Sequence, residues 1–303
     1  MESSWSIPYR TASLVPFWGP QTSAVNFCEE DYIITHYVAE FFNTLTSLAY
    51  IGYGIHGINR LRRRDVGPFS AVNLPYWGLI GVGIFSGLYH STMKYHTQMA
   101  DEMSMHLAMG CVLIQLFTFQ QPPHLARRNA AIIVIGLASF VTYHCLTDEF
   151  VLHVILFFSL SVLVGQKTRA IIRSTVKSQA HRDAMSSLAT VATCTALFAY
   201  GLWNIDVNFC PTLTRWKRQV GMPLGVVLEL HGWWHILTAI ASYIFMALVE
   251  FLTYAQHEGT HGVGFAWPAK KVLAGLVAKE DEGVNGKAGN GSLNGHASKT
   301  KST

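Results

Sequence analysis

Long apolar runs are the feature that most restricts what this chain can fold into. The sequence is 50% hydrophobic and only 13% charged, whereas about 25% of the residues of a water-soluble protein are charged. Many of the apolar residues fall in runs near the ~20 residues that a bilayer core requires. The sequence therefore predicts an all-α, polytopic membrane protein.

Seven stretches of the sequence are candidate transmembrane helices. They cover residues 37–58, 72–92, 99–119, 129–146, 150–166, 187–204 and 225–249, of which the fifth is the shortest. The chain divides accordingly into an N-terminal segment (1–36), a seven-helix membrane domain (37–254) and a tail (255–303). From about residue 279 the tail lacks the apolar residues needed to fold, so we expect disorder there.

The distribution of Lys and Arg predicts the orientation of the chain. The connections after the first, third and fifth candidate helices hold eleven of these residues, and the N-terminal segment and the other connections hold five. By the positive-inside rule the N-terminus is lumenal or extracellular and the C-terminus is cytosolic. The basic residues are not arranged for nucleic acid, and no nucleic-acid partner is expected.

Two groups of polar residues lie in or at the ends of the predicted helices, where ionisable groups are costly and are therefore functional candidates. Ser86 and His90 are four residues apart near the end of the second helix, and Asp101 opens the third. His231 and His235 are four apart in "LHGWWHIL", early in the seventh. Residues four apart share a helix face. The predicted topology places all five at similar depth in the lumenal leaflet.

Three histidines at one depth suit a zinc ion that keeps its fourth position for water. Asp101 is a candidate general base for that water, or a group that orients it, and Ser86 is a candidate donor to a developing oxyanion. The alternative is that these histidines only form hydrogen bonds between membrane helices.

Other ionisable residues of the predicted helices receive the simpler interpretation. His56, His106, His144 and His153 have no equivalent set of partners, so we treat them as ordinary interhelical residues. Glu102 follows Asp101 but points about 100° away from it on a helix, and we rank it below Asp101 as a catalytic candidate.

A third polar group precedes the first helix. Asn26, Glu29, Asp31 and Glu40 offer hard oxygen donors within fifteen residues, and such donors favour Ca²⁺. Their spacing is not that of an EF-hand loop, and on chemistry alone a solvated acidic turn explains them.

Two cysteines flank the predicted helices on the lumenal side, where disulfides persist. They are Cys28, before the first helix, and Cys210, after the sixth. A bridge between them is allowed, and two free thiols are the alternative.

Four segments of the chain together resemble the alkaline ceramidases, seven-helix members of a superfamily of membrane hydrolases that includes the adiponectin receptors. They are "WGPQTSAVNFCEEDYIITHYVAEFFN", "SGLYHSTMKYHTQMADE", "WNIDVNFC" and "HGWWHILT", in order from about residue 18 to about residue 250. The resemblance implies hydrolysis of the ceramide amide to a sphingoid base and a fatty acid, and we expect a location in the endoplasmic reticulum or Golgi membrane. It implies zinc on His90, His231 and His235, with Ser86 and Asp101 in the catalytic shell.

The resemblance also implies a structural or regulatory calcium ion and a disulfide. The calcium ligands would be Asn26, the backbone carbonyl of Phe27, Glu29, Asp31 and Glu40, and the disulfide would join Cys28 and Cys210. In the family the first calcium position is usually Asp and the fourth is often Asn. Here Asn26 and Asp31 exchange these residue types, and the negative charge of the set is kept. On this interpretation none of the calcium ligands belongs to the histidine site.

Two other functions could use the same features. A receptor on the adiponectin-receptor scaffold would keep the zinc and signal through its tail, but the tail shows no docking motif. A transporter would use the buried polar residues as an ion path, but no inverted repeat and no pair of helices broken by Gly or Pro is visible in the sequence.

Overall fold

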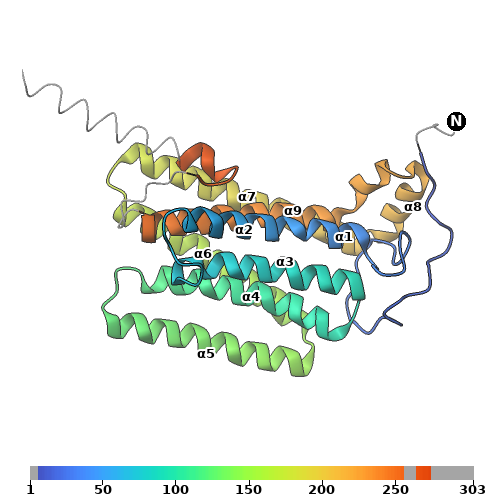
Figure 1. Ribbon diagram of the computed structural model, residues 1–303, viewed down its shortest axis with the longest axis horizontal. Coiled ribbons are helices and arrows are strands. Elements are labelled where there is room, and N and C mark those ends of the chain that lie inside the picture. The colour runs from blue at the N-terminus through green and yellow to red at the C-terminus, as the bar shows by residue number, and fades with distance from the viewer. Residues whose placement is uncertain (1–5, 256–263, 274–303) are drawn as a thin grey trace, which may run out of the picture.

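The computed structural model describes residues 6–255 and 264–273. Within these ranges every regular element is a helix, apart from one isolated β-bridge between Ile7 and Met222. The long helices lie side by side along the long axis of the molecule (Figure 1). The all-α prediction is confirmed.

The long helices match predicted segments but have shifted ends. They are α3 (Leu74–Thr92), α4 (Tyr95–Thr118), α5 (Pro123–Thr147), α6 (Phe150–Thr175), α7 (Gln179–Asn208) and α9 (Leu230–Glu250). Short segments η1 (Ala71–Asn73), η2 (Leu224–Leu228) and η3 (Phe251–Ala255) adjoin α3 and α9. Helices α6 and α7 continue further toward each other than predicted, because they extend through basic residues that a hydropathy criterion leaves out.

The first predicted helix, residues 37–58, is two helices that meet at Ser47: α1 (Phe41–Thr46) and α2 (Leu48–Arg62). The Ser47 hydroxyl donates to the carbonyl of Asn43 at 2.9 Å, and the Thr46 hydroxyl donates to the carbonyl of Phe42 at 2.8 Å. Hydroxyl groups that bond back to the preceding turn bend helices. The interruption is therefore explained by the Thr-Leu-Thr-Ser sequence around it.

Five helical segments are long and apolar enough to cross a membrane. They are Ala71–Thr92, Pro123–Thr147, Phe150–Thr175, Gln179–Asn208 and Leu230–Tyr254. Helices α2 and α4 are not among them, since α2 has only 15 residues and α4 carries the polar Asp101 and Glu102. Both nevertheless pack against α3. The chain is thus a multi-pass membrane protein, and its seven spans stay a prediction.

The outward faces of the bundle are apolar. On α5, Ile132, Val134 and Ile135 are each more than half exposed, and the helix has a single buried residue, His144. A helix at a water-exposed surface normally turns polar residues outward. These faces are therefore suited to lipid.

One end of the bundle is covered by the N-terminal segment and by α8 (Cys210–Val220), a helix that the sequence did not predict (Figure 1). A disulfide joins Cys28 to Cys210 with a Cα–Cα distance of 5.1 Å. Beside it, the fully buried Lys217 ammonium donates to the Cys28 carbonyl and to the carboxylate of Glu229, both at 2.8 Å. These contacts fix the N-terminal segment over the start of α9.

At the other end, part of the tail returns to the bundle. Phe265, Ala269 and Leu273 are buried in the same apolar core as α2 and α9, and the Arg60 guanidinium lies 3.9 Å from the ring centre of Phe265. Residues 264–273 therefore pack on the membrane domain. The disorder predicted from about residue 279 concerns residues outside the described ranges, and the domain boundary at 254 stays a prediction.

Candidate metal and catalytic site

The three histidines predicted to bind zinc meet at the end of the bundle that α8 covers. His90 comes from the last turns of α3, and His231 and His235 from the first turns of α9. One candidate ligand atom from each lies within 4.8 Å of the other two, and all three side chains are buried. The i, i+4 spacing and the shared depth correctly predicted that these side chains converge.

The contacts of two histidines fix their tautomers. The Nδ1 of His90 donates to the carboxylate of Glu40, and the Nδ1 of His235 donates to the carbonyl of Asn43 at 3.1 Å, an oxygen that can only accept. Each Nε2 therefore keeps its lone pair. The Nε2 of His90 is buried with no hydrogen-bond partner. Histidines that bind metals are typically oriented in this way through their other nitrogen, so the residues present fit a zinc ion.

His231 is positioned by groups that the sequence did not assign. The ring of Phe27 stacks on the imidazole, with ring centres 3.5 Å apart. The backbone amide of His231 donates to one carboxylate oxygen of Asp206 at 3.2 Å, and the other Asp206 oxygen accepts from the backbone amide of Cys28 at 2.9 Å. Since α9 has no side-chain cap of its own, Asp206 satisfies one of its first amides. The only available signal was an acid at the end of an apolar helix, within "WNIDVNFC".

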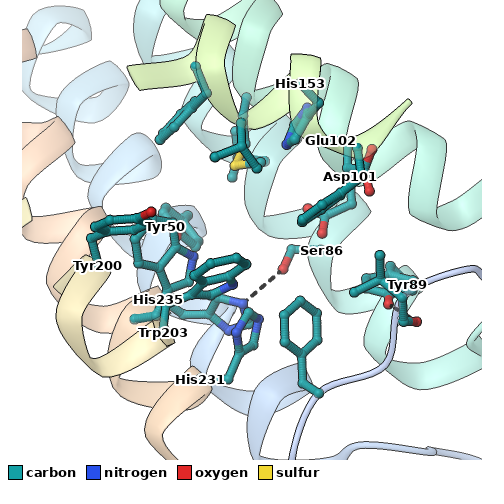
Figure 2. Close-up of a pocket in the computed structure, with 18 of the residues that line it drawn as sticks. Tyr50, Ser86, Tyr89, Asp101, Glu102, His153, Tyr200, Trp203, His231 and His235 are labelled. Atoms are coloured by element: carbon teal, nitrogen blue, oxygen red, sulfur yellow. Dashed lines mark hydrogen bonds between the residues drawn. The ribbon is translucent and has the colours of Figure 1, made fainter. Parts of the chain in front are cut away.

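Ser86 lies one turn before His90 on α3 and is almost completely buried. Its hydroxyl oxygen is 3.0 Å from that of Ser47 and 3.5 Å from the Nε2 of His235 (Figure 2). The hydroxyl therefore lies beside the nitrogen lone pair that a metal would use.

Asp101 lines the same cavity, of about 70 Å³, as Ser86, His231 and His235. Figure 2 shows Asp101 across this cavity from His235, with Ser86 between them. Glu102 also reaches the cavity wall. The structure thus brings together the predicted catalytic and zinc-binding residues, and it adds a second carboxylate to their surroundings.

A second cavity of about 280 Å³ adjoins the first between α4, α6, α7 and α9, and its lining is largely apolar. The two share the wall residues Tyr50, Val82, Met105, Phe157, Phe158 and Trp234. A long alkyl chain could occupy this space with its polar end at the histidines.

The predicted calcium ligands surround the start of α1. The two oxygens of Glu29 accept from the amides of Phe42 and Asn43 at 2.7 and 2.8 Å. The Asn26 amide donates to one oxygen of Asp31 at 3.2 Å, while the other Asp31 oxygen is buried without a partner. Burial raises the pKa of both the Glu29 and the Asp31 carboxyl groups. The unpartnered oxygen of Asp31 fits a hard cation.

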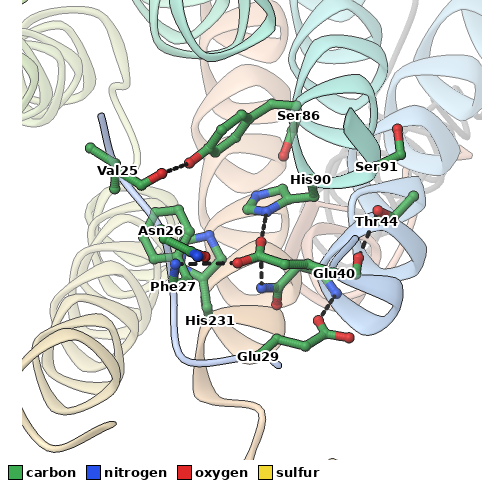
Figure 3. Close-up of polar contacts among 12 residues, drawn as sticks. Val25, Asn26, Phe27, Glu29, Glu40, Thr44, Ser86, His90, Ser91 and His231 are labelled. Atoms are coloured by element: carbon green, nitrogen blue, oxygen red, sulfur yellow. Dashed lines mark hydrogen bonds and ion pairs between the residues drawn. The ribbon is translucent and has the colours of Figure 1, made fainter. Parts of the chain in front are cut away.

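Glu40 joins this acidic set to the histidines. Its carboxylate accepts from the backbone amide of Phe27 at 3.2 Å and also from the Nδ1 of His90 (Figure 3). The expectation that no predicted calcium ligand belongs to the histidine site is wrong for Glu40. No local sequence pattern indicates this contact, because the turn before α1 folds back over a helix fifty residues away.

Known proteins resemble this chain over most of its length. A family model described as Ceramidase matches residues 19–277. An alkaline ceramidase of Saccharomyces cerevisiae is 29% identical, with 91% of this chain and 90% of the relative aligned. Alkaline ceramidase 3 of Mus musculus is 28% identical, with 84% of this chain and 93% of the relative aligned. An alkaline ceramidase of Arabidopsis thaliana is 26% identical, with 80% of this chain and 88% of the relative aligned. The histidines, Ser86, Asp101 and the acidic residues before α1 lie within the matched range, and the chain belongs to the ceramidase family.

Proposed function

We propose that this protein is a zinc-dependent hydrolase that cleaves the amide bond of ceramide within the membrane. As a member of the ceramidase family it is an enzyme that acts on ceramide. The observation that carries the finer proposal is the convergence of three buried histidines, His90, His231 and His235. Two of them, His231 and His235, line one cavity together with Ser86 and Asp101. An apolar chamber adjoins that cavity, as a lipid substrate requires.

Zinc held by the three histidines would supply Lewis acidity and a nucleophilic hydroxide near neutral pH. Asp101 accepts a proton from the attacking water and delivers it to the amide nitrogen as the carbon–nitrogen bond breaks. The sphingoid base leaves as an amine and the acyl chain as a fatty acid. Ser86 donates a hydrogen bond to the carbonyl oxygen as negative charge develops there.

We infer that a calcium ion stabilises the lumenal rim of this site, held by Asn26, the Phe27 carbonyl, Glu29, Asp31 and Glu40. The unpartnered oxygen of Asp31 supports this. Among the ion pairs of the described residues, none gives Glu29, Asp31 or Glu40 a lysine or arginine partner. A divalent cation would offset the repulsion between these carboxylates.

The proposed topology has seven spans, with α1–α2 and α4 completing the set, a lumenal N-terminus and a cytosolic C-terminus, in the endoplasmic reticulum or Golgi membrane. The positive-inside distribution supports it. The Cys28–Cys210 disulfide would then lie in an oxidising compartment. Maleimide should label these two cysteines from the lumenal side alone, and only after reduction.

The deciding experiment uses the purified full-length protein in detergent with labelled ceramide. We expect release of sphingoid base that stops when zinc is removed by a chelator and returns when zinc alone is restored. Uptake of substrate into proteoliposomes without hydrolysis would favour a transporter. Ceramide left intact by zinc-loaded protein, with a ligand-dependent conformational change, would favour a receptor.

A further inference from the structure

A second buried group of potential metal ligands lies beside the zinc site, and two of its members, Glu102 and His153, also line the catalytic cavity. Glu102 of α4, His144 of α5 and His153 of α6 each place one candidate ligand atom within 4.8 Å of the other two. All three side chains are at least nine-tenths buried. The sequence interpretation treated these histidines as ordinary interhelical residues, because their convergence depends on three different helices.

The contacts within the group leave two imidazole nitrogens without a hydrogen-bond partner. One oxygen of Glu102 accepts from the Gln98 amide at 2.9 Å, and the other lies 2.5 Å from the Nε2 of His144. The Nδ1 atoms of His144 and His153 are buried with no hydrogen-bond partner. Buried polar atoms without partners are uncommon in native proteins and need an explanation.

The charge of Glu102 also needs compensation. Its one ion-pair partner among the described residues is His144, an imidazole that is neutral unless it takes up a proton. A carboxylate in the interior of a membrane domain is expensive unless a positive group accompanies it. A divalent cation would supply that charge and would use the spare imidazole nitrogens.

The position of the group gives such a cation a structural task. His144 is the single buried residue of α5, a helix that lies at the edge of the bundle and packs on α4 (Figure 1). His144 and His153 stand on either side of the short connection between α5 and α6. A link from both histidines to Glu102 would therefore attach this helix pair to the start of α4, where Asp101 faces the cavity.

We propose that Glu102, His144 and His153 form a second metal site, a structural one that takes a divalent transition-metal ion such as zinc. Two imidazoles and a carboxylate are a donor set that zinc uses and that calcium, which prefers oxygen, does not. The site does not depend on the proposed reaction, because its ligands are separate from the three histidines of the active site.

Cobalt titration of the chelator-treated, full-length protein tests this, with Co²⁺ absorbance and elemental analysis as readouts. Wild type should bind two ions per chain. His144→Gln, which retains a hydrogen-bonding group toward Glu102, and His153→Gln should each bind one. His90→Ala should also bind one, and His90→Ala combined with His144→Gln should bind none. His106→Gln is the matched control, since it removes a neighbouring buried imidazole that is not in the group, and it should still bind two.

A second readout guards against variants that fold poorly. In the His90→Ala protein, added zinc should raise the melting temperature by mass action, and combining this variant with His144→Gln or His153→Gln should abolish the rise. A wild type that binds one ion, with His90→Ala binding none, would overturn the second site and leave Glu102–His144 as a hydrogen-bonded pair. Two bound ions in His144→Gln and in His153→Gln would overturn it equally. Either result leaves the proposed zinc chemistry at His90 untouched.

Discussion

The carboxylate of Glu40 accepts the Nδ1 hydrogen of His90, and neither side chain has any exposure to solvent. The contact holds the His90 ring with its Nε2 toward His231 and His235. A carboxylate behind a metal-binding histidine orients the ring and raises its basicity. Glu40 thus connects the N-terminal acidic segment to the histidine site, and conditions that move this segment should also change the affinity for metal.

Glu40→Gln should weaken zinc binding by about 10–100-fold, the usual cost of losing a group that orients a ligand. The amide oxygen can still accept the hydrogen bond, but the negative charge is lost. Competition with a chromogenic chelator measures the change. Glu30→Gln is the control, because Glu30 pairs with the partly exposed Arg218 and does not contact a histidine. Equal zinc affinities in wild type and Glu40→Gln would contradict this role.

His90→Ala, His231→Ala and His235→Ala should each lose zinc from the histidine site together with hydrolysis, because each removes one of three protein ligands. Measuring the metal content of folded, monodisperse protein checks this. His56→Ala should retain both zinc and activity, since His56 lies far along α2 and contacts the backbone of Gly264. Full zinc occupancy at this site in all three variants would show that the ligands lie elsewhere.

Asp101→Asn should retain zinc yet lose about 10²–10⁴-fold in turnover, since the amide cannot accept the proton of the attacking water. Ser86→Ala should cost at most ~10²–10³-fold, the range for a single oxyanion donor. Turnover at saturating ceramide is the measurement, with zinc content as the control. Near-normal turnover of Asp101→Asn would show that another group is the general base.

The sequence was sufficient for the parts of the site that follow from helix geometry. Ser86 and His90, and likewise His231 and His235, share a helix face by spacing alone, and the alternation of loops put both pairs at one depth. The sequence was also sufficient to predict the all-α fold, because apolar runs of this length have few structural alternatives to membrane-spanning helices. Helix ends were less predictable, since basic residues continue α6 and α7 beyond the apolar segments.

The remainder of the site depends on contacts that no local pattern encodes. Glu40 meets His90 only because the chain before α1 folds back across α3. Asp206 caps α9 from a different helix. Asp101 and Glu102 point about 100° apart on α4, so a site on one side of the helix would take only Asp101. Glu102 nevertheless reaches both the cavity and His144.

Calcium should stabilise the protein more at pH 8 than at pH 5.5. Burial raises the pKa of Glu29 and Asp31 above their ordinary values of about 4. In calcium-free protein the folded state then holds protons that the unfolded state has released, so these groups favour folding at low pH and lose that contribution as the pH rises. Calcium requires the ionised carboxylates, so its apparent affinity should increase over the same range.

Melting temperatures across a calcium titration at the two pH values check this. Asp31→Asn should reduce the calcium-induced shift and its dependence on pH. Arg10→Gln, a change in the same N-terminal segment outside the acidic set, should leave both unchanged. If calcium does not change the melting temperature at pH 8, the segment is an acidic turn without a bound ion.

Asp206→Asn should destabilise the fold and loosen the histidine site together. The aspartate accepts from two backbone amides, those of Cys28 and His231, whereas an asparagine offers one acceptor oxygen and turns an NH₂ group toward the second amide. A buried donor left without an acceptor costs about 1–3 kcal/mol. Because one of the two amides belongs to His231, the start of α9 should shift and zinc affinity should fall. Asn208→Asp is the control, since Asn208 lies two residues away on α7, is exposed and bonds to its own helix. Thermal unfolding with and without zinc measures both effects, and a melting temperature and zinc affinity equal to those of wild type would show that Asp206 does not cap α9.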